Sequence, residues 1–452
     1  MTNRRHLLLV QAAAAIAAAL AFAPIRAASF DGPLYAIRGA RIFTAAGAPI
    51  DNGVVVMRNG VIEGVGAAVT VPPDAVVIDA SGMSVYPGLI DMGNDATLEP
   101  PSGAGAQGAQ AGRGGGGGRG GGAPAAQMPY EEVERAKRAQ LLRPDFVSAD
   151  NLRTESPEQT QLASAGVTTV LARTESGIFK GQSALVNVLV PPDRPQVSEI
   201  ADYRKGLAVL KSPVASHIDI GGRAGGPGYP NSLLGSIAFT RQALLDAAWQ
   251  RDAEARYQKQ SATGQRPVVE PALEALRPLL ARQLPAAFDA NLAREIDRVL
   301  AIASEFNLDP IVVGASGAAD RTAELAAAKA RVILSLNFPG GQGGGGGRGG
   351  GRGGGGGAQP SLQELKERQN APKVPAALAQ ASIPFAFTSG GATPADFVRN
   401  AGRVVSEGGL PADAALRALT IDAAKIAGAA DRVGSIEKGK AANVIVTEGD
   451  LF

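Results

Sequence analysis

The first part of the chain alternates short apolar and polar runs in a way that predicts a small antiparallel β unit. Runs rich in β-forming residues, such as 35–37 and 53–57, are separated by turn-forming residues. The pair Asn59 and Gly60 predicts a hairpin turn, because both residues tolerate a positive φ. We therefore expect residues 29–86 to form a small β domain.

From residue 87 onward, apolar strand-like runs alternate with longer segments whose apolar residues recur every three or four positions. Eight runs are typical of buried strands: residues 87–92, 166–171, 184–189, 215–220, 286–290, 310–314, 331–338 and 384–388. Helices are predicted between them, among others at residues 233–258, 273–282, 292–306 and 321–330. This alternation predicts an α/β fold, a (β/α)8 TIM-like barrel over residues 87–431.

Two low-complexity inserts interrupt the pattern, at residues 101–126 and 340–359. Both are rich in glycine with scattered arginine, so they cannot bury enough apolar surface to become ordered. They follow the first and the seventh predicted strand, which places them at the carboxyl ends of the barrel strands, where sites are built in this fold. The inserts contain only a few arginines, so no nucleic-acid partner is expected.

The N-terminal residues 1–28 have the pattern of an export signal. Arg4 and Arg5 precede an apolar run of about 17 residues, and the small residues Ala27 and Ala28 offer a cleavage site. The run is short and rich in alanine, so no stable membrane span is expected. We expect a periplasmic or extracellular protein after cleavage, exported by the general or the twin-arginine route.

The net charge and the absence of cysteine exclude some functions and some kinds of site. Without the three arginines of residues 1–27, the 44 basic residues fall to 41 against 42 acidic ones, so charge does not indicate a polyanion binder. The chain has no cysteine, which excludes disulfides and thiolate metal ligands.

Several longer motifs resemble the amidohydrolase superfamily, in particular its imidazolonepropionase and dihydroorotase-like members. They lie at residues 78–91, 165–170, 414–425 and 434–446. The resemblance implies the barrel and, beside it, a small β-sandwich formed from both chain ends, residues 29–86 and 432–452. Relatives usually continue beyond the position of Phe452, so the sandwich is expected to be incomplete or completed by another polypeptide. The partners that this implies are a related exported amidohydrolase subunit or a second copy in a homo-oligomer.

The resemblance also implies where a metal site would lie. The superfamily activates water on one or two divalent metals held by four histidines and one aspartate, and these positions fall here on Gly93, Asp95, Asp289, Gly314 and Gly390, or on Ser389 if the last is shifted by one residue. The only histidine after the export signal is His217, so four histidine ligands are impossible and no metal cofactor is expected. The alternative is a divalent metal: zinc, or Mg²⁺, Ca²⁺ or Mn²⁺ held by Asp91, Asp95 and Asp289 alone.

Individual residues leave two interpretations open. His217 is either a general base oriented by Asp219, or acting with Asp289, or a structural histidine on its strand. Lys180 is either an anion ligand or, as we expect, a solvated lysine, and Asp91 is expected to bind backbone amides at the barrel mouth.

Taken together, the sequence favours an exported amidohydrolase-like protein with a degraded metal site, a non-catalytic subunit that binds an unidentified small molecule or a partner. The alternative is a hydrolase that cleaves non-peptide carbon–nitrogen bonds through an atypical site.

Overall fold

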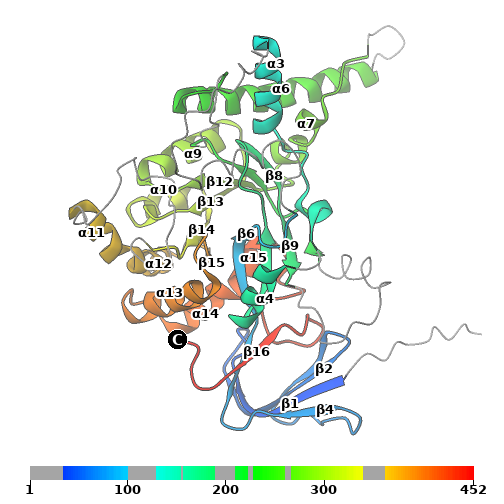
Figure 1. Cartoon of the computed structure of the whole chain (residues 1–452), viewed down its shortest axis with the longest axis vertical. Coiled ribbons are helices and arrows are strands. Elements are labelled where there is room, and N and C mark those ends of the chain that lie inside the picture. The colour runs from blue at the N-terminus through cyan, green and yellow to red at the C-terminus, as the bar shows by residue number, and fades with distance from the viewer. Residues whose placement is uncertain are drawn as a thin grey trace, which may run out of the picture.

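The computed structural model describes residues 34–99, 129–153, 156–188, 209–221, 228–259, 266–338 and 362–452. The predicted export signal and both glycine-rich inserts lie outside the described residues. A β-sheet formed by the two chain ends lies at one end of the molecule, and the remaining strands and helices build a larger α/β body above it (Figure 1). None of the described helices is both long and apolar enough to cross a membrane.

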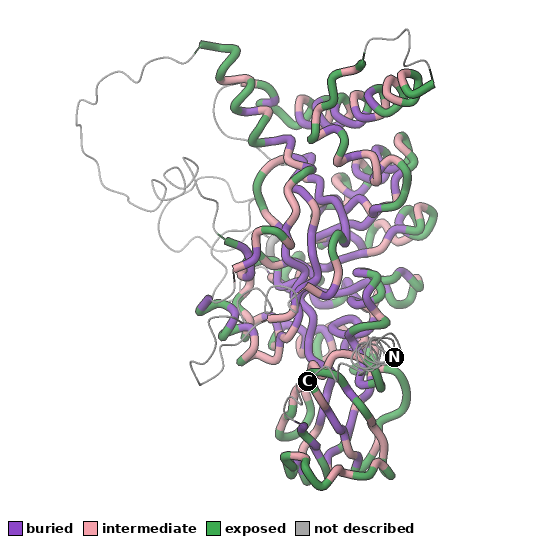
Figure 2. Tube along the Cα trace, turned by 90° about the vertical axis from the view of Figure 1, so that its right-hand side faces the viewer, coloured by how far each residue is buried: buried purple, intermediate pink, exposed green. Residues whose placement is uncertain are grey.

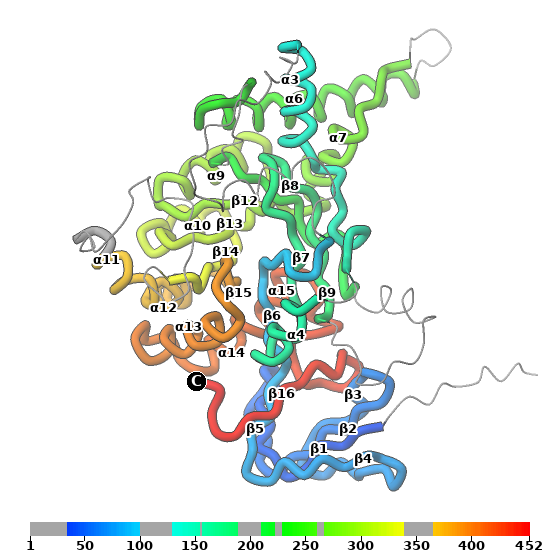
Figure 3. Tube along the Cα trace, in the orientation of Figure 1, coloured from blue at the N-terminus to red at the C-terminus, as the bar shows by residue number. Residues whose placement is uncertain are grey.

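The sheet at the chain ends, here called the terminal sheet, contains strands from both termini. Its strands are β1 (Leu34–Ile42), β2 (Ile50–Arg58), β3 (Val61–Gly66), β4 (Val76–Asp79), β5 (Ser84–Pro87) and β16 (Val444–Thr447). β16 pairs antiparallel with β5, so strands from both chain ends meet in one sheet as expected (Figure 3). Asn59 and Gly60 have φ values of 53° and 73° and form the predicted hairpin turn. The strands form one continuous hydrogen-bonded sheet, and the expected two-layer sandwich is not confirmed.

Two further sheets form the α/β body. The short sheet has the order β10-β9-β7-β6 and the long sheet the order β15-β14-β13-β12-β11-β8. Their bounds are β6 (Leu89–Asn94), β7 (Val167–Ala172), β8 (Phe179–Gln182), β9 (Ala184–Asn187), β10 (Val209–Lys211), β11 (Ser216–Ile218), β12 (Ala286–Ala290), β13 (Pro310–Gly314), β14 (Arg331–Ser335) and β15 (Phe385–Thr388).

Each of the eight predicted strand positions contains a strand, but a closed parallel barrel is not seen in the described part of the chain. β9 runs antiparallel to β7, and β8 runs antiparallel to β11. The connection from β7 to β8 consists of residues 173–178 only, whereas a parallel crossover needs a dozen residues or more. The chain therefore reverses direction after β7. The prediction of a regular (β/α)8 barrel is wrong at the third predicted strand, β9, because β9 is antiparallel to β7.

The helices pack outside the long sheet and at the ends of the body. They are α3 (Tyr130–Leu141), α4 (Pro157–Ser164), α6 (Leu233–Lys259), α7 (Pro271–Glu274), α8 (Arg277–Leu280), α9 (Ala293–Glu305), α10 (Thr322–Ala327), α11 (Leu362–Asn370), α12 (Val374–Gln380), α13 (Pro394–Ser406), α14 (Ala412–Leu419) and α15 (Ile421–Ala427), with 3₁₀ turns at Ser148–Asn151, Ala318–Arg321 and Ala371–Lys373. The predictions at residues 233–258 and 292–306 match α6 and α9 closely. The helix predicted at residues 273–282 is instead split into α7 and α8, because Pro278 has no N–H to continue the first helix.

Alternate residues of the central strands point to opposite sides of the sheets and build two cores. Ala287 of β12 faces an inner core, which also holds Ile90 of β6 and Ala423 of α15. Phe288, the next residue, faces an outer core together with Ile296 of α9. Burial on both sides explains why these strands are continuous apolar runs, and Figure 2 shows the buried positions along the centre of the body.

Candidate functional site

Five charged side chains meet at the carboxyl ends of the central strands. Arg173 directly follows β7, Asp219 directly follows β11, and Asp289 is the fourth residue of β12. Glu175 lies in the short connection from β7, and Lys180 is the second residue of the reversed strand β8. We call these five residues the Arg173–Lys180 cluster.

The carboxylates of the Arg173–Lys180 cluster surround its two cations. Asp289 accepts from Nη1 of Arg173 at 3.0 Å with one oxygen, and its other oxygen is bound to Nζ of Lys180. Asp219 lies 3.4 Å from the same Nζ. Glu175 bridges both cations, with Oε1 at 2.8 Å from Nη2 of Arg173 and Oε2 at 3.2 Å from Nζ of Lys180. Only 9% of the Arg173 side chain and 2% of the Lys180 side chain are exposed, so this is a buried ion network.

The protonation states follow from this geometry. Burial alone would raise the pKa of Asp289, but the charges of Arg173 and Lys180 outweigh it and hold that pKa below its ordinary value. Burial alone would lower the pKa of Lys180, but Asp289, Glu175 and Asp219 outweigh it and raise that pKa. Burial raises the pKa of Asp219 in spite of the adjacent ammonium group. Both cations and Asp289 are therefore charged at neutral pH.

Three positions that the resemblance assigns to metal ligands are glycines, and neighbouring side chains fill the space beside them. A Cβ on Gly93 would lie 2.9 Å from Oγ1 of Thr388 and 3.0 Å from Nε of Arg173. A Cβ on Gly314 would collide with Asn291, and one on Gly390 with Ser335. Gly314 and Gly390 also have positive φ, +93° and +57°, which side chains rarely adopt. Side chains larger than glycine are therefore disfavoured at these three positions.

The residues present do not fit the metal that the fold family implies. Within the described ranges, no group of three or more histidine, cysteine, aspartate or glutamate side chains could hold a metal ion. Asp289, at the position of one histidine ligand, is already bound by two cations. Asp95 is exposed, whereas Asp91 is fully buried, so the proposed cage of Asp91, Asp95 and Asp289 is not assembled.

Asp91 has the role expected from the sequence. Its Oδ1 accepts the backbone N–H of Ser389 at 2.9 Å, and its Oδ2 accepts Nδ2 of Asn94 at 3.1 Å. Burial raises the pKa of Asp91 despite these hydrogen bonds. The carboxyl group ties the end of β6 to the end of β15, where no backbone ladder joins the two described strands.

His217 lies within the body beside the Arg173–Lys180 cluster, but it does not pair with Asp219. Both ring nitrogens are buried and find no hydrogen-bond partner among the described residues. Asp219 instead binds Lys180 and the backbone N–H of Gly221. Burial, reinforced by the positive charge of Arg173, lowers the pKa of His217 to about 3, so the ring is neutral at physiological pH. The dyad of His217 and Asp219 that the sequence suggested is not formed in this geometry.

Sequence reasoning missed the most prominent feature of the site, the buried cations. Arg173 was not singled out, and the expectation that Lys180 is solvated is wrong, because its side chain is buried in ion pairs. One signal was available in the sequence: Arg173 directly follows an apolar strand at the end where sites are built, and Lys180 is flanked by Phe179 and Gly181.

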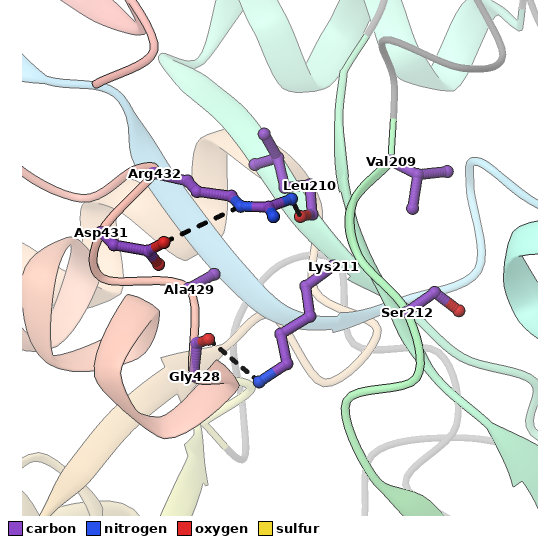
Figure 4. Close-up of a pocket in the computed structure, with 8 residues that line it drawn as sticks. All are labelled: Val209, Leu210, Lys211, Ser212, Gly428, Ala429, Asp431 and Arg432. Carbon is purple, nitrogen blue, oxygen red and sulfur yellow. Dashed lines mark hydrogen bonds and ion pairs between the residues drawn. The ribbon is translucent and has the colours of Figure 1, made fainter. Parts of the chain in front are cut away.

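A separate cavity of about 320 Å³ lies between β10 and the loop after α15 (Figure 4). It is lined by Val209, Leu210, Lys211, Ser212, Gly428, Ala429, Asp431 and Arg432. Nζ of Lys211 donates to the carbonyl oxygen of Gly428 at 2.9 Å, and Nη1 of Arg432 donates to that of Leu210 at 2.5 Å. These bonds fasten the loop to β10, and the cavity shares no residue with the Arg173–Lys180 cluster.

Comparisons with known proteins concern both sequence and fold. Residues 358–451 match the family model described as the amidohydrolase family. A solved amidohydrolase from Thermotoga maritima MSB8 superposes with a TM-score of 0.68 at 19% identity, covering 92% of this chain and 94% of that one. No curated protein matches the chain.

Two more distant structures are similar to smaller degrees. A putative prolidase from Bifidobacterium longum has a TM-score of 0.47 at 14% identity, covering 93% of this chain and 90% of that one. A zinc-bound adenosine deaminase from Xanthomonas campestris has a TM-score of 0.43 at 16% identity, covering 92% and 85%. The reactions named for these two proteins are not carried over to this chain.

Proposed function

We propose that the chain is a non-catalytic member of the amidohydrolase superfamily, whose family model matches residues 358–451. In this proposal the protein is exported, holds no catalytic metal, and uses the former active site to bind a small molecule or its terminal sheet to bind a partner. In this proposal the protein recognises a small molecule or a partner and does not hydrolyse a substrate.

One observation supports the proposal: two buried cations lie beside Gly93 and Asp289, positions that the resemblance assigns to metal ligands. Arg173 and Lys180 are both bound to Asp289, which stands at the position of a metal-binding histidine. Two unit charges of like sign about 4 Å apart repel by roughly 4 kcal/mol at an effective dielectric constant of 20. A divalent ion at that distance carries two charges, so it would meet about twice that repulsion from each side chain. In this proposal the two cations oppose metal binding and pair with Asp289, the acid at one of the expected ligand positions.

The experiment is a metal analysis of the purified protein together with hydrolysis assays. We expect zinc, manganese, magnesium and iron to lie far below one ion per chain after dialysis, and no hydrolysis of amide, lactam or dipeptide substrates. Stoichiometric metal with hydrolysis that a chelator removes would contradict the proposal and favour the carbon–nitrogen hydrolase. Hydrolysis without metal that Asp289→Asn abolishes would contradict it as well.

The partner role is supported by an edge of the terminal sheet. In the described part of the chain β4 pairs only with β1, and all four residues of β4 are exposed, including 56% of Val76. An exposed apolar edge strand offers unpaired backbone groups to another chain. We propose that this edge binds a related exported subunit or a second copy. Light scattering of the protein, alone and mixed with periplasmic extract, tests this, and a monomer in both samples would refute it.

Export is supported by residues 1–28 alone, which carry Arg4, Arg5 and the apolar run. N-terminal sequencing of the protein recovered from the periplasm is expected to begin near residue 28. A chain retained in the cytoplasm with its first residues intact would contradict this part of the proposal.

A further inference from the structure

We propose that Arg173 and Lys180 form a receptor for a small ligand bearing one carboxylate, and that the Glu175 side chain occupies this receptor in the free protein. The inference rests on the proposed function, because a metal ion at Asp289 would displace both cations. It adds the chemical class of the ligand and a device that competes with it.

Glu175 is bound as an external carboxylate would be. Each of its oxygens meets a different cation, Nη2 of Arg173 at 2.8 Å and Nζ of Lys180 at 3.2 Å. Charge-assisted hydrogen bonds from two donors to the two oxygens of one carboxylate are among the stronger contacts in proteins. The receptor geometry is therefore already present around a side chain of the protein itself.

Burial separates the fixed part of the Arg173–Lys180 cluster from the exchangeable part. The side chains of Arg173 and Lys180 are 91% and 98% buried, and Asp289 holds them in place from the inside. Glu175 is 48% exposed and lies in the connection of residues 173–178, so a ligand arriving from solvent reaches its position. When Glu175 leaves, its carboxylate regains water, and half-exposed ion pairs hold their partners weakly. Glu175 is thus the carboxylate that can be exchanged.

Unsatisfied polar atoms in the same place point to a ligand. Nε of Arg173 is buried and has no hydrogen-bond partner among the described residues, and the same holds for both ring nitrogens of His217. A buried polar group left without a partner costs about 1–3 kcal/mol, so such groups are rare where nothing is to be bound. His217 of β11 pairs with Gly181 of β8, the residue directly after Lys180, so the histidine lies beside the cluster.

Charge balance selects the kind of anion. With Glu175 in place, the two cations face three carboxylates, those of Glu175, Asp219 and Asp289. Once Glu175 has left, two cations face two carboxylates, and a ligand with one negative charge restores the original balance. A phosphate dianion would add a further negative charge beside Asp219 and Asp289. The receptor should therefore prefer a monocarboxylate to phosphate.

The experiment removes the tethered carboxylate and supplies a free one. In Glu175→Ala, acetate and propionate are expected to bind at least about tenfold more tightly than to the wild type, which corresponds to about 1.4 kcal/mol. Calorimetry and the rise in melting temperature with added acetate are the measurements, and inorganic phosphate at equal ionic strength should bind more weakly. The matched control is Glu63→Ala, which breaks the half-exposed pair with Arg58 on the terminal sheet and should gain no acetate binding.

The outcomes separate the two proposals. Equal acetate affinity in Glu175→Ala, Glu63→Ala and wild type, with circular dichroism showing all three folded, would overturn the receptor while leaving a metal-free protein intact. Tighter phosphate than acetate binding to Glu175→Ala would overturn the stated ligand class. Glu175→Gln, which keeps the shape of the side chain without its charge, gives a second test if the alanine variant does not fold, and it too should bind acetate more tightly than wild type. Stoichiometric metal in the wild type would refute the proposed function itself.

Discussion

Replacing Asp289 with asparagine tests whether the buried cations depend on it. The substitution keeps the shape of the side chain but leaves Arg173 and Lys180 without the carboxylate that binds both of them. Removing one partner from a buried ion pair typically costs about 3–5 kcal/mol, because a charge remains buried without compensation. Glu175 and Asp219 still contact the cations, so we expect a loss near the lower end of that range.

The assay is urea unfolding of Asp289→Asn beside a matched surface variant. Asp297→Asn breaks the ion pair with Arg321, whose two side chains are far more exposed, and should cost less than about 1 kcal/mol. The double variant Asp289→Asn with Lys180→Met removes one orphaned cation as well, so its loss should be smaller than the sum of the single losses by about 0.5–3 kcal/mol. Equal stability of Asp289→Asn and Asp297→Asn would refute the buried network.

Three further predictions concern the pH dependence of stability, the expected ligand position Gly390 and the titration of His217. Folding lowers the pKa of Asp289, so its contribution to stability is fully present above its unfolded pKa of 3.8 and is lost as the pH falls through the lower folded value. The difference in unfolding free energy between wild type and Asp289→Asn should therefore shrink below pH 3.8. A constant difference in acid would contradict this. Gly390→Asp, which places an aspartate where the resemblance expects a metal ligand, should bind no metal and lose about 1–3 kcal/mol of unfolding free energy, because it combines a positive φ with a collision against Ser335. Metal uptake measured by calorimetry would contradict this. The His217 ring, with its pKa lowered to about 3, should show no titration by NMR between pH 5 and 8, and a midpoint near 6.5 would mean that the ring is solvated.

Much of the fold could be predicted from the sequence, because local patterns carry it. The turn at Asn59 and Gly60, the helices α6 and α9 and the positions of the central strands follow from periodicity and turn chemistry, which depend on neighbouring residues only. The antiparallel course of β8 and β9 was not predicted, although the shortness of residues 173–178 already excludes a crossover helix.

The sequence by itself determined that residues 29–452 cannot supply four histidine ligands to a metal, because His217 is their only histidine. Only the tertiary structure decided which charged side chains meet at the carboxyl ends of the central strands. Asp289 lies 116 residues from Arg173 and 109 residues from Lys180 along the chain, and a lysine is solvated or buried according to which carboxylates the fold brings within about 3 Å of it. Composition shows which charged groups exist. The burial and pairing of those groups set their pKa values, and both depend on distances that only folding creates.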